Sequence, residues 1–289
     1  MVYLEDCFDY RLLDYRHSAP LTFSKSCRTE RKGVHDMNRV AAFMYGVVVY
    51  LIFIAMWLYT VGFVGNVIVQ KTIDSGPAES FFKSLLINTA LLALWAIPHS
   101  VMVRPRFKEW WTKIVPAPIE RSTYVLIASL LMILILHQWK PMPKVVWNIE
   151  NSFGYFTLTV LYYIGWLTVL YSSFLIDHFD QCGLKQVYLY LRGKEYTPLD
   201  FKTPSLYKIV RHPIMMGFAL AFWATPRMTV GHLVFAIAMT VYIIIGTIFE
   251  ERDLVKAFGE TYINYKRQVP VLPLPKKSRL ELETNTEEV

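Results

Sequence analysis

Six long stretches of the 289-residue chain contain no Asp, Glu, Lys or Arg. These runs constrain the fold strongly, because about 20 consecutive apolar residues in a helix cross the roughly 30 Å hydrocarbon core of a bilayer. Charged residues make up only 18% of the chain, against roughly a quarter in soluble domains. The sequence therefore predicts an all-α polytopic membrane protein with about six transmembrane helices. The charge-free runs are residues 40–70, 84–103, 122–139, 151–176, 212–226 and 228–249.

The fifth run is short, at 15 residues, and begins with a His-Pro dipeptide. We expect it either to borrow residues 206–211 to complete a span, or to form one arm of a tight hairpin with the sixth run. The last two helices are therefore predicted to be a helical hairpin, followed by a cytoplasmic tail.

The Lys and Arg residues outside the runs predict the orientation. Alternate connecting segments carry 25 of these residues on one side and 5 on the other. Because Lys and Arg gather in cytoplasmic connections, we expect an integral, multi-pass membrane protein with both termini cytoplasmic. This bias also accounts for the net charge of +7, so the charge does not require a nucleic-acid partner. The expected partner is membrane lipid, and no required protein partner is predicted.

The chain divides into four segments. Residues 1–37 form an N-terminal extension expected to be poorly ordered, with Met37 as a candidate native start. We expect residues 38–176 to hold the first four helices, residues 177–275 to hold a cytoplasmic loop, the hairpin and a tail, and residues 276–289 to form a disordered tail. The three cysteines are far apart in the sequence, which predicts neither a disulfide framework nor a metal site.

Polar and charged residues cluster at the predicted cytoplasmic ends of the runs. The first of these clusters is Arg211-His212-Pro213. Proline suits the first position of a helix, which places His212 near the N-cap. A helix N-terminus beside an arginine favours a carboxylate or phosphate ligand, and Gly217, four residues after Pro213, would let a ligand lie against the backbone. The alternative is an interfacial Arg-His-Pro that only begins a helix.

Two adjacent carboxylates, Glu250 and Glu251, directly follow the sixth run. In a hairpin they return close to Arg211 and His212, where they would hold ribose hydroxyls or a substrate ammonium, or simply pair with the arginine. Further along, Tyr262 and Tyr265 share one helix face. That face either rests on the membrane interface or caps a bound aromatic base.

Histidines at the ends of the second and fourth runs, His99 and His178, lie on the same predicted side as His212. Each is either an interfacial residue or a general base. The runs themselves contain no Asp, Glu, Lys or Arg, which argues against an ion-coupled transporter, because such proteins place ionisable groups near the bilayer centre.

These residues resemble a known family. The C-terminal pattern resembles that of the isoprenylcysteine carboxyl methyltransferase-type membrane methyltransferases, and upstream stretches are similar to their nurim-like branch, the methanethiol S-methyltransferases. The resemblance covers roughly residues 38–275. The C-terminal pattern is Arg211-His212-Pro213, Gly217, Glu250-Glu251, Leu254, Phe258-Gly259, Tyr262, Tyr265 and Val269-Pro270, and the upstream stretches are 98–102, 110–111, 120–124 and 174–180.

The resemblance implies S-adenosyl-L-methionine as cofactor and places the methyl-donor site in residues 177–275. One departure concerns Met215, which stands where the family often has tyrosine, two residues after the proline; a polarizable methionine suits a small sulfur substrate. Carried over by motif, the candidate cofactor-binding residues are Arg211, His212, Met215, Gly217, Glu250, Glu251, Tyr262 and Pro270, and the candidate catalytic residues are His99, His178 and Arg211.

The resemblance therefore implies methyl transfer to a small thiol, methanethiol to dimethyl sulfide, at the cytoplasmic face. In this hypothesis Arg211 holds the cofactor carboxylate, Glu251 holds its amino group or ribose, and a histidine accepts the thiol proton. Two alternatives remain. One is a methyltransferase acting on a prenylcysteine carboxylate or a lipid amine, and the other is a nurim-like structural protein without enzymatic activity.

Overall fold

The computed structural model describes residues 37–272. The predicted extension, apart from Met37, and the predicted tail at 276–289 lie outside the described residues. Five helices are long and apolar enough to cross a membrane, and they place the chain among all-α polytopic membrane proteins, as the sequence predicts. They are α1 (Arg39–Gly65), α2 (Phe81–Val101), α4 (Ala117–Gln138), α5 (Ser152–Ile176) and α9 (Val230–Phe258).

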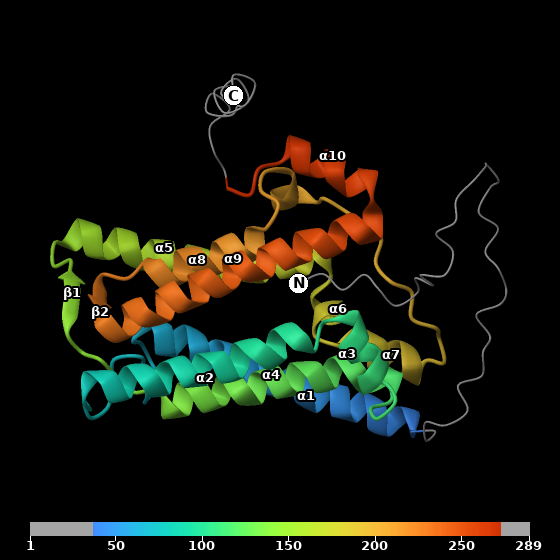
Figure 1. The fold of residues 1–289 in the computed structure, drawn as a ribbon, viewed down its shortest axis with the longest axis horizontal. Helices are drawn as coiled ribbons and strands as arrows, with labels where there is room; N and C mark the ends of the chain where they lie inside the picture. The colour runs from blue at the N-terminus through green and yellow to red at the C-terminus, as the bar shows by residue number, and fades with distance from the viewer. Residues whose placement is uncertain (1–36, 273–289) are drawn as a thin grey trace.

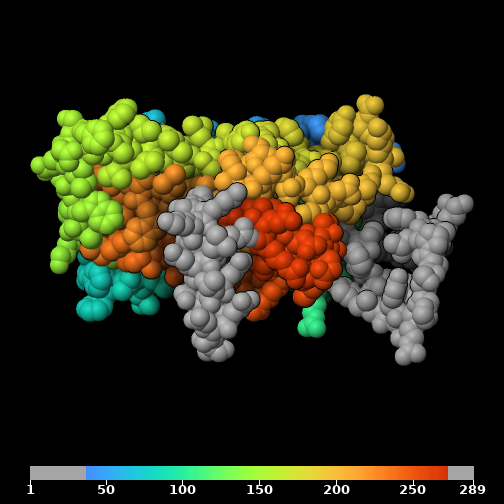
Figure 2. All heavy atoms as spheres, turned by 90° about the horizontal axis from the view of Figure 1, so that it is seen from above, coloured from blue at the N-terminus to red at the C-terminus, as the bar shows by residue number. Residues whose placement is uncertain are grey.

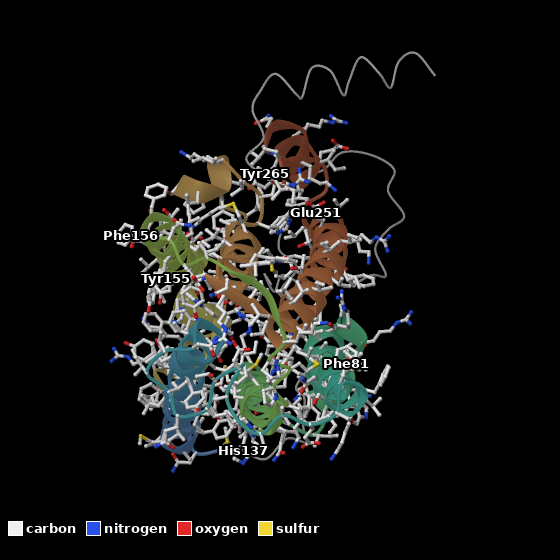
Figure 3. The ribbon with its side chains drawn as sticks, turned by 90° about the vertical axis from the view of Figure 1, so that its left-hand side faces the viewer. Phe81, His137, Tyr155, Phe156, Glu251 and Tyr265 are labelled. Carbon is white, nitrogen blue, oxygen red and sulfur yellow. The ribbon has the colours of Figure 1, made fainter. Side chains whose placement is uncertain are left out.

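The long helices run side by side in two layers (Figure 1). One layer holds α1, α2 and α4, and the other holds α5, α9 and the shorter α8 (Pro213–Trp223). Large apolar side chains on these helices stay exposed, as Tyr155 and Phe156 of α5 do at 56% and 67% (Figure 3). An apolar outer surface of this kind suits contact with lipid rather than water.

The short elements separate to the two ends of the molecule (Figure 1). We call one the α10 end; its short elements are α3 (Pro105–Trp111), α6 (His178–Gln181), α7 (Leu184–Leu191), the 3₁₀ helix η2 (Ser205–Lys208) and α10 (Glu260–Gln268). The other, the ribbon end, carries β1 (Val145–Asn148) paired antiparallel with β2 (Arg227–Thr229). The connections rich in Lys and Arg thus meet at the α10 end.

The fifth charge-free run follows the second of the two expectations, because its helix is short and forms one arm of a hairpin with the sixth run. Helix α8 has 11 residues and is therefore about 16 Å long, too short for a bilayer core of about 30 Å. Pro226 explains where the helix stops, because a proline drives the preceding residue, here Thr225, out of the helical conformation. The chain continues as β2, whose pairing with β1 satisfies backbone groups. The expected six spanning helices become five long helices and one short one.

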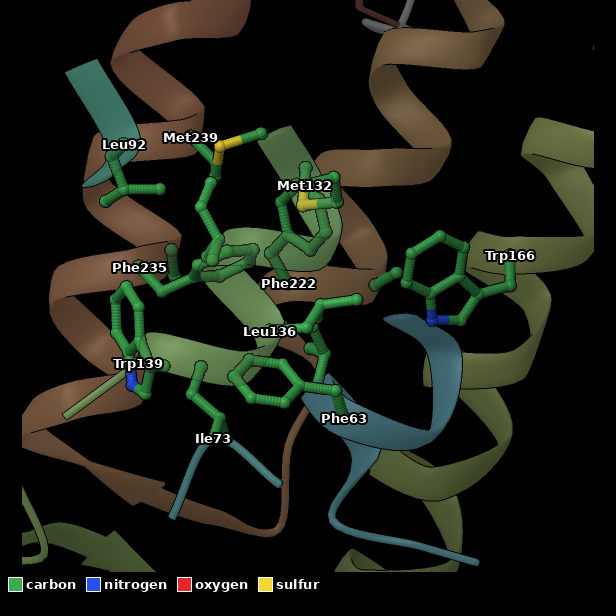
Figure 4. Close-up of a cluster of buried hydrophobic side chains, with 14 of the residues drawn as sticks. Phe63, Ile73, Leu92, Met132, Leu136, Trp139, Trp166, Phe222, Phe235 and Met239 are labelled. Atoms are coloured by element: carbon green, nitrogen blue, oxygen red, sulfur yellow. The ribbon is translucent and has the colours of Figure 1, made fainter. Parts of the chain in front are cut away.

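The core of the bundle lies towards the ribbon end and is built from interlocking aromatic rings (Figure 4). Trp139 is fully buried and meets both Phe63 and Phe235 edge-on, with ring centroids 6.4 and 5.8 Å apart. Phe222 of α8 contacts Phe235 at 5.2 Å. Edge-to-face pairs of this kind add to the stabilisation from burial. They join α1, α8 and α9 to the end of α4.

Close backbone contact brings α8 against α5. A Cβ atom on Gly217 would lie 2.7 Å from the carbonyl oxygen of Gly165 and 3.0 Å from the amide nitrogen of Val169. In the other direction, a Cβ atom on Gly165 would lie 2.7 Å from the amide nitrogen of Ala221. Only glycines permit this approach, because helix backbones have no room to yield at such distances.

The substitution Gly217→Ala tests this contact. The added methyl group would force α5 and α8 apart, and we expect overpacking of about 1–3 kcal/mol, seen as a loss of ~5 °C in Tm for the detergent-solubilised protein. Gly246→Ala on α9 is the matched control, since a Cβ atom there meets nothing within 4 Å. Equal Tm values for the two variants would contradict the packing account.

Candidate active site

The first turn of α8 and the last turns of α9 meet at the α10 end, as the hairpin prediction requires. Figure 3 shows Glu251 and Tyr265 close together, on the opposite side of the molecule from His137. Pro213 occupies the first turn of α8 and His212 its N-cap position. Gly259, with a φ of 54°, adopts a backbone that favours glycine and turns the chain from α9 into α10.

The Glu251 carboxylate is bonded to three cationic side chains. Its Oε1 accepts from Arg211 Nε at 2.8 Å and lies 3.1 Å from His212 Nε2, while its Oε2 lies 2.7 Å from Lys266 Nζ. The Glu251 side chain is only 13% exposed, and a carboxylate this buried is stable only when paired. We call these four residues the ion cluster.

Arg211 also binds the chain that follows α10. Its Nη1 donates to the carbonyl oxygens of Lys266 and Val269 at 3.0 and 2.7 Å, and its backbone N–H donates to the carbonyl oxygen of Pro270 at 3.0 Å. Arg211 therefore holds Glu251 and the end of α10 in place. Pro270 contributes to this contact only through its backbone carbonyl, which accepts the hydrogen bond from the Arg211 backbone.

His212 lies between two carboxylates, because its Nδ1 is 3.6 Å from Glu250 Oε2. Burial by itself lowers the pKa of His212, but hydrogen bonds and charge interactions with Glu250 and Glu251 outweigh it, and the pKa rises above its usual value. The two carboxylates therefore favour the protonated form of the His212 imidazole in the ion cluster.

A cavity of about 810 Å³, including the part open to solvent, adjoins the ion cluster. Its wall combines charged groups, aromatic rings and an apolar side. The charged and imidazole lining residues are Asp200, Lys202, Arg211, His212 and Glu250; the aromatic ones are Phe201, Tyr207, Tyr262 and Tyr265; and the apolar ones are Ile176, Leu199, Ile214, Met215 and Leu254.

Tyr262 gives the clearest sign that the cavity receives a polar ligand. This residue is 1% exposed, and its buried hydroxyl has no hydrogen-bond partner within residues 37–272. Burial, followed by the charges of Glu251 and Glu250, raises the pKa of Tyr262, so the hydroxyl keeps its proton. Since an unsatisfied buried hydroxyl is costly, a ligand hydroxyl or ring nitrogen would remove this cost.

The candidate cofactor-binding residues therefore fall into three groups. Arg211, His212, Met215, Glu250 and Tyr262 line the cavity. Glu251 and Pro270 support the wall through their bonds to Arg211. Gly217 lies in the α5–α8 contact and is absent from the cavity wall.

His99 belongs to a different cluster, between α2 and α9. Its Nδ1 is 2.6 Å from the Tyr242 hydroxyl, and its ring stacks on Trp95 with centroids 4.6 Å apart. The Tyr124 hydroxyl donates to its backbone carbonyl at 3.4 Å. His99 is not among the residues that line the cavity.

His178 belongs to a third cluster, where α6 meets α1 and α5. Its Nδ1 is 2.9 Å from Ser173 Oγ, and its Nε2 is 3.1 Å from the Tyr50 hydroxyl. Burial lowers the pKa of His178, although the Asp177 charge raises it in part. The buried pair between Arg121 and Asp180 (2.5 Å) fixes the same helix α6 to α4. The structure thus separates His178 from the cavity.

The reasoning from sequence missed the segment Leu199–Lys202, which forms part of the cavity wall. The segment lies in the connection between α7 and η2, within a stretch bounded by Pro198 and Pro204. The local sequence offers one signal that this segment contributes to the site: Asp200 and Lys202 flank the aromatic Phe201 shortly before the Arg-His-Pro pattern.

Comparison with known proteins agrees with this architecture. Residues 87–273 match the family model described as NnrU protein. The chain is 50% identical to a methanethiol S-methyltransferase from Crocosphaera subtropica over 82% of this chain and 92% of that protein, and 49% identical to one from Mycobacterium tuberculosis over 82% and 97%. Nurim from Bos taurus is 28% identical over 61% of this chain and 70% of its own. No solved structure matches the chain.

Fold and cavity together define a polytopic membrane protein with a partly charged cavity at one end of a helical hairpin. The chain belongs to the NnrU protein family, and its relatives of about 50% identity are methanethiol S-methyltransferases.

The charge of His212 predicts a pH-dependent stability. A histidine whose pKa is raised in the folded state stabilises fully below its unfolded pKa of about 6.5, and this contribution is lost as pH rises through the folded pKa. The Tm of the parent protein should therefore exceed that of His212→Gln most below pH 6.5, and the difference should shrink at higher pH. His137→Gln, exposed at the ribbon end, is the control. A difference that grows with pH would contradict the cluster's charge state.

Proposed function

We propose that this protein is an integral membrane enzyme that transfers a methyl group from S-adenosyl-L-methionine to methanethiol, forming dimethyl sulfide. The observation that carries the proposal is the 50% identity to a methanethiol S-methyltransferase over 82% of the chain. The cavity at the α10 end, with its unsatisfied Tyr262 hydroxyl, gives independent support.

The residues of the cavity suit such a methyl donor. When bound, S-adenosyl-L-methionine would supply a sulfonium methyl group. The thiolate would bond to that methyl carbon in line as the bond between the carbon and the sulfonium sulfur breaks, so that S-adenosylhomocysteine leaves and a methyl thioether forms. Tyr207, Tyr262 and Tyr265 offer aromatic surface for an adenine ring. We place a polar atom of the nucleoside beside the Tyr262 hydroxyl, which has no hydrogen-bond partner among the described residues.

The apolar side of the cavity suits a small thiol. Ile214 and Met215 from α8 meet Ile176 from α5 and Leu254 from α9 in the same wall. A wall of this kind excludes water, and a drier pocket favours a reaction in which an anion and a cation neutralise each other. Met215 adds a polarizable sulfur to this surface.

The proton of the thiol has one nearby acceptor among the residues singled out from the sequence. His99 and His178 lie in separate clusters, and the two carboxylates beside His212 raise its pKa, which favours its protonated form. Glu250 lines the cavity and is 8% exposed. We therefore assign the thiol proton to the Glu250 carboxylate, with His212 beside it.

The orientation belongs to the same proposal. The connections at the α10 end carry most of the Lys and Arg residues, and such connections stay in the cytoplasm. The cavity then opens towards the compartment that supplies a water-soluble donor, while methanethiol, a small apolar molecule, partitions into the lipid around the helices.

The direct test uses purified protein, methyl-labelled S-adenosyl-L-methionine and methanethiol. We expect labelled dimethyl sulfide, and a KM for the donor raised about 3- to 10-fold in Tyr262→Phe, since one hydrogen bond is lost. Tyr163→Phe is the control, because Tyr163 faces outward from α5 at 41% exposure.

Other outcomes separate the alternatives. Label found only in a prenylcysteine carboxylate or a lipid amine would reject methanethiol as acceptor. Absence of donor binding in calorimetry would reject the enzyme and favour a nurim-like structural role.

A further inference from the structure

The cavity wall contains two opposite charges that have no partner in the described part of the chain. Asp200 and Lys202 both line the cavity, and neither makes a hydrogen bond or ion pair among residues 37–272. Both residues lie in segment 199–202, which is outside the motifs that resemble the methyltransferase family.

The charged groups of the ion cluster, in contrast, bond to one another and to the backbone. Glu251 uses Oε1 for Arg211 and His212 and Oε2 for Lys266. Arg211 uses its Nε for Glu251 and its Nη1 for two backbone carbonyl oxygens. These bonds commit the Glu251 carboxylate and the Nε and Nη1 groups of Arg211 to the wall, whereas the side chains of Asp200 and Lys202 are not committed to any partner among residues 37–272.

An aromatic contact fixes the segment beside the cavity. The ring of Phe201, which separates the two charged residues, packs against Phe258, Tyr262 and Tyr265, with centroids 5.1, 5.7 and 5.4 Å apart. In Figure 2 the red atoms of α10 lie against the golden atoms of the connection before α8. Because Phe201 is anchored, Asp200 and Lys202 stay at the cavity even though both are exposed to solvent.

We propose that Asp200 and Lys202 bind the amino-acid end of the methyl donor, Asp200 its α-ammonium group and Lys202 its α-carboxylate. This inference rests on the proposed function. An α-amino acid carries one positive and one negative group on adjacent atoms, so an acidic and a basic side chain on one wall complement both. The same arrangement leaves Tyr262 and Tyr265 for the nucleoside end, and it replaces Arg211 as the residue that holds the carboxylate.

The test compares two ligands that differ in this end. S-adenosylhomocysteine has the amino-acid end, and 5′-methylthioadenosine lacks it. By calorimetry on the full-length protein in detergent, we expect Asp200→Asn and Lys202→Met each to weaken S-adenosylhomocysteine about 10-fold, with the affinity for 5′-methylthioadenosine unchanged. Glu195→Gln and Lys194→Met, exposed in the same connection and outside the cavity wall, are the matched controls.

Three results would overturn the inference. Unchanged affinity for S-adenosylhomocysteine in both variants would show that the charges stay in solvent. Equal loss for the two ligands, with the parent Tm retained, would show that the segment shapes the cavity without contacting the amino-acid end. Failure of the parent protein to bind either ligand would reject the proposed function itself, a result distinct from the first two.

Discussion

The carboxylate of Glu251 is the point on which the geometry of the site depends. It lies near the end of α9 and binds Arg211 and His212 from the start of α8 and Lys266 from α10. Because a buried carboxylate is costly without such partners, the three segments are held at fixed positions relative to one another. The cavity lies beside them, so this set of charges fixes the position of one part of its wall.

The glycine contact between α5 and α8 supplies the second constraint. Gly165 and Gly217 let the two helices approach until backbone touches backbone, and the neighbouring Ile214 and Met215 then join Ile176 in the cavity wall. Helix packing thus acts on α8 itself, and ion pairing acts on the two residues directly before its first turn. Together they place an apolar surface and a charged surface a few residues apart, which is what a polar donor and an apolar acceptor require in one cavity.

Much of this arrangement was accessible from the sequence. The charge-free runs predict the five long helices, and the hairpin argument predicts that Arg211 and His212 meet Glu250 and Glu251. Four features depend on tertiary contacts that no local pattern encodes. Pro226 shortens α8, but the pairing of β2 with β1 joins segments about 80 residues apart. In the sequence, Gly217 suggests a place where a ligand lies against the backbone. In the structure, the backbone of α5 occupies that place. His99 shares a predicted side with the site, yet its ring lies against Trp95 and Tyr242, and the role of Leu199–Lys202 follows only from where the fold places that segment.

Ultraviolet cross-linking of labelled S-adenosyl-L-methionine to the purified protein, followed by peptide mapping, tests most directly whether the methyl donor binds beside the ion cluster. The account predicts label in peptides that contain residues 199–215 and 250–265, with loss of label when excess S-adenosylhomocysteine is present. Label confined to peptides around His99 or His178 would place the donor in another part of the bundle and would contradict the account.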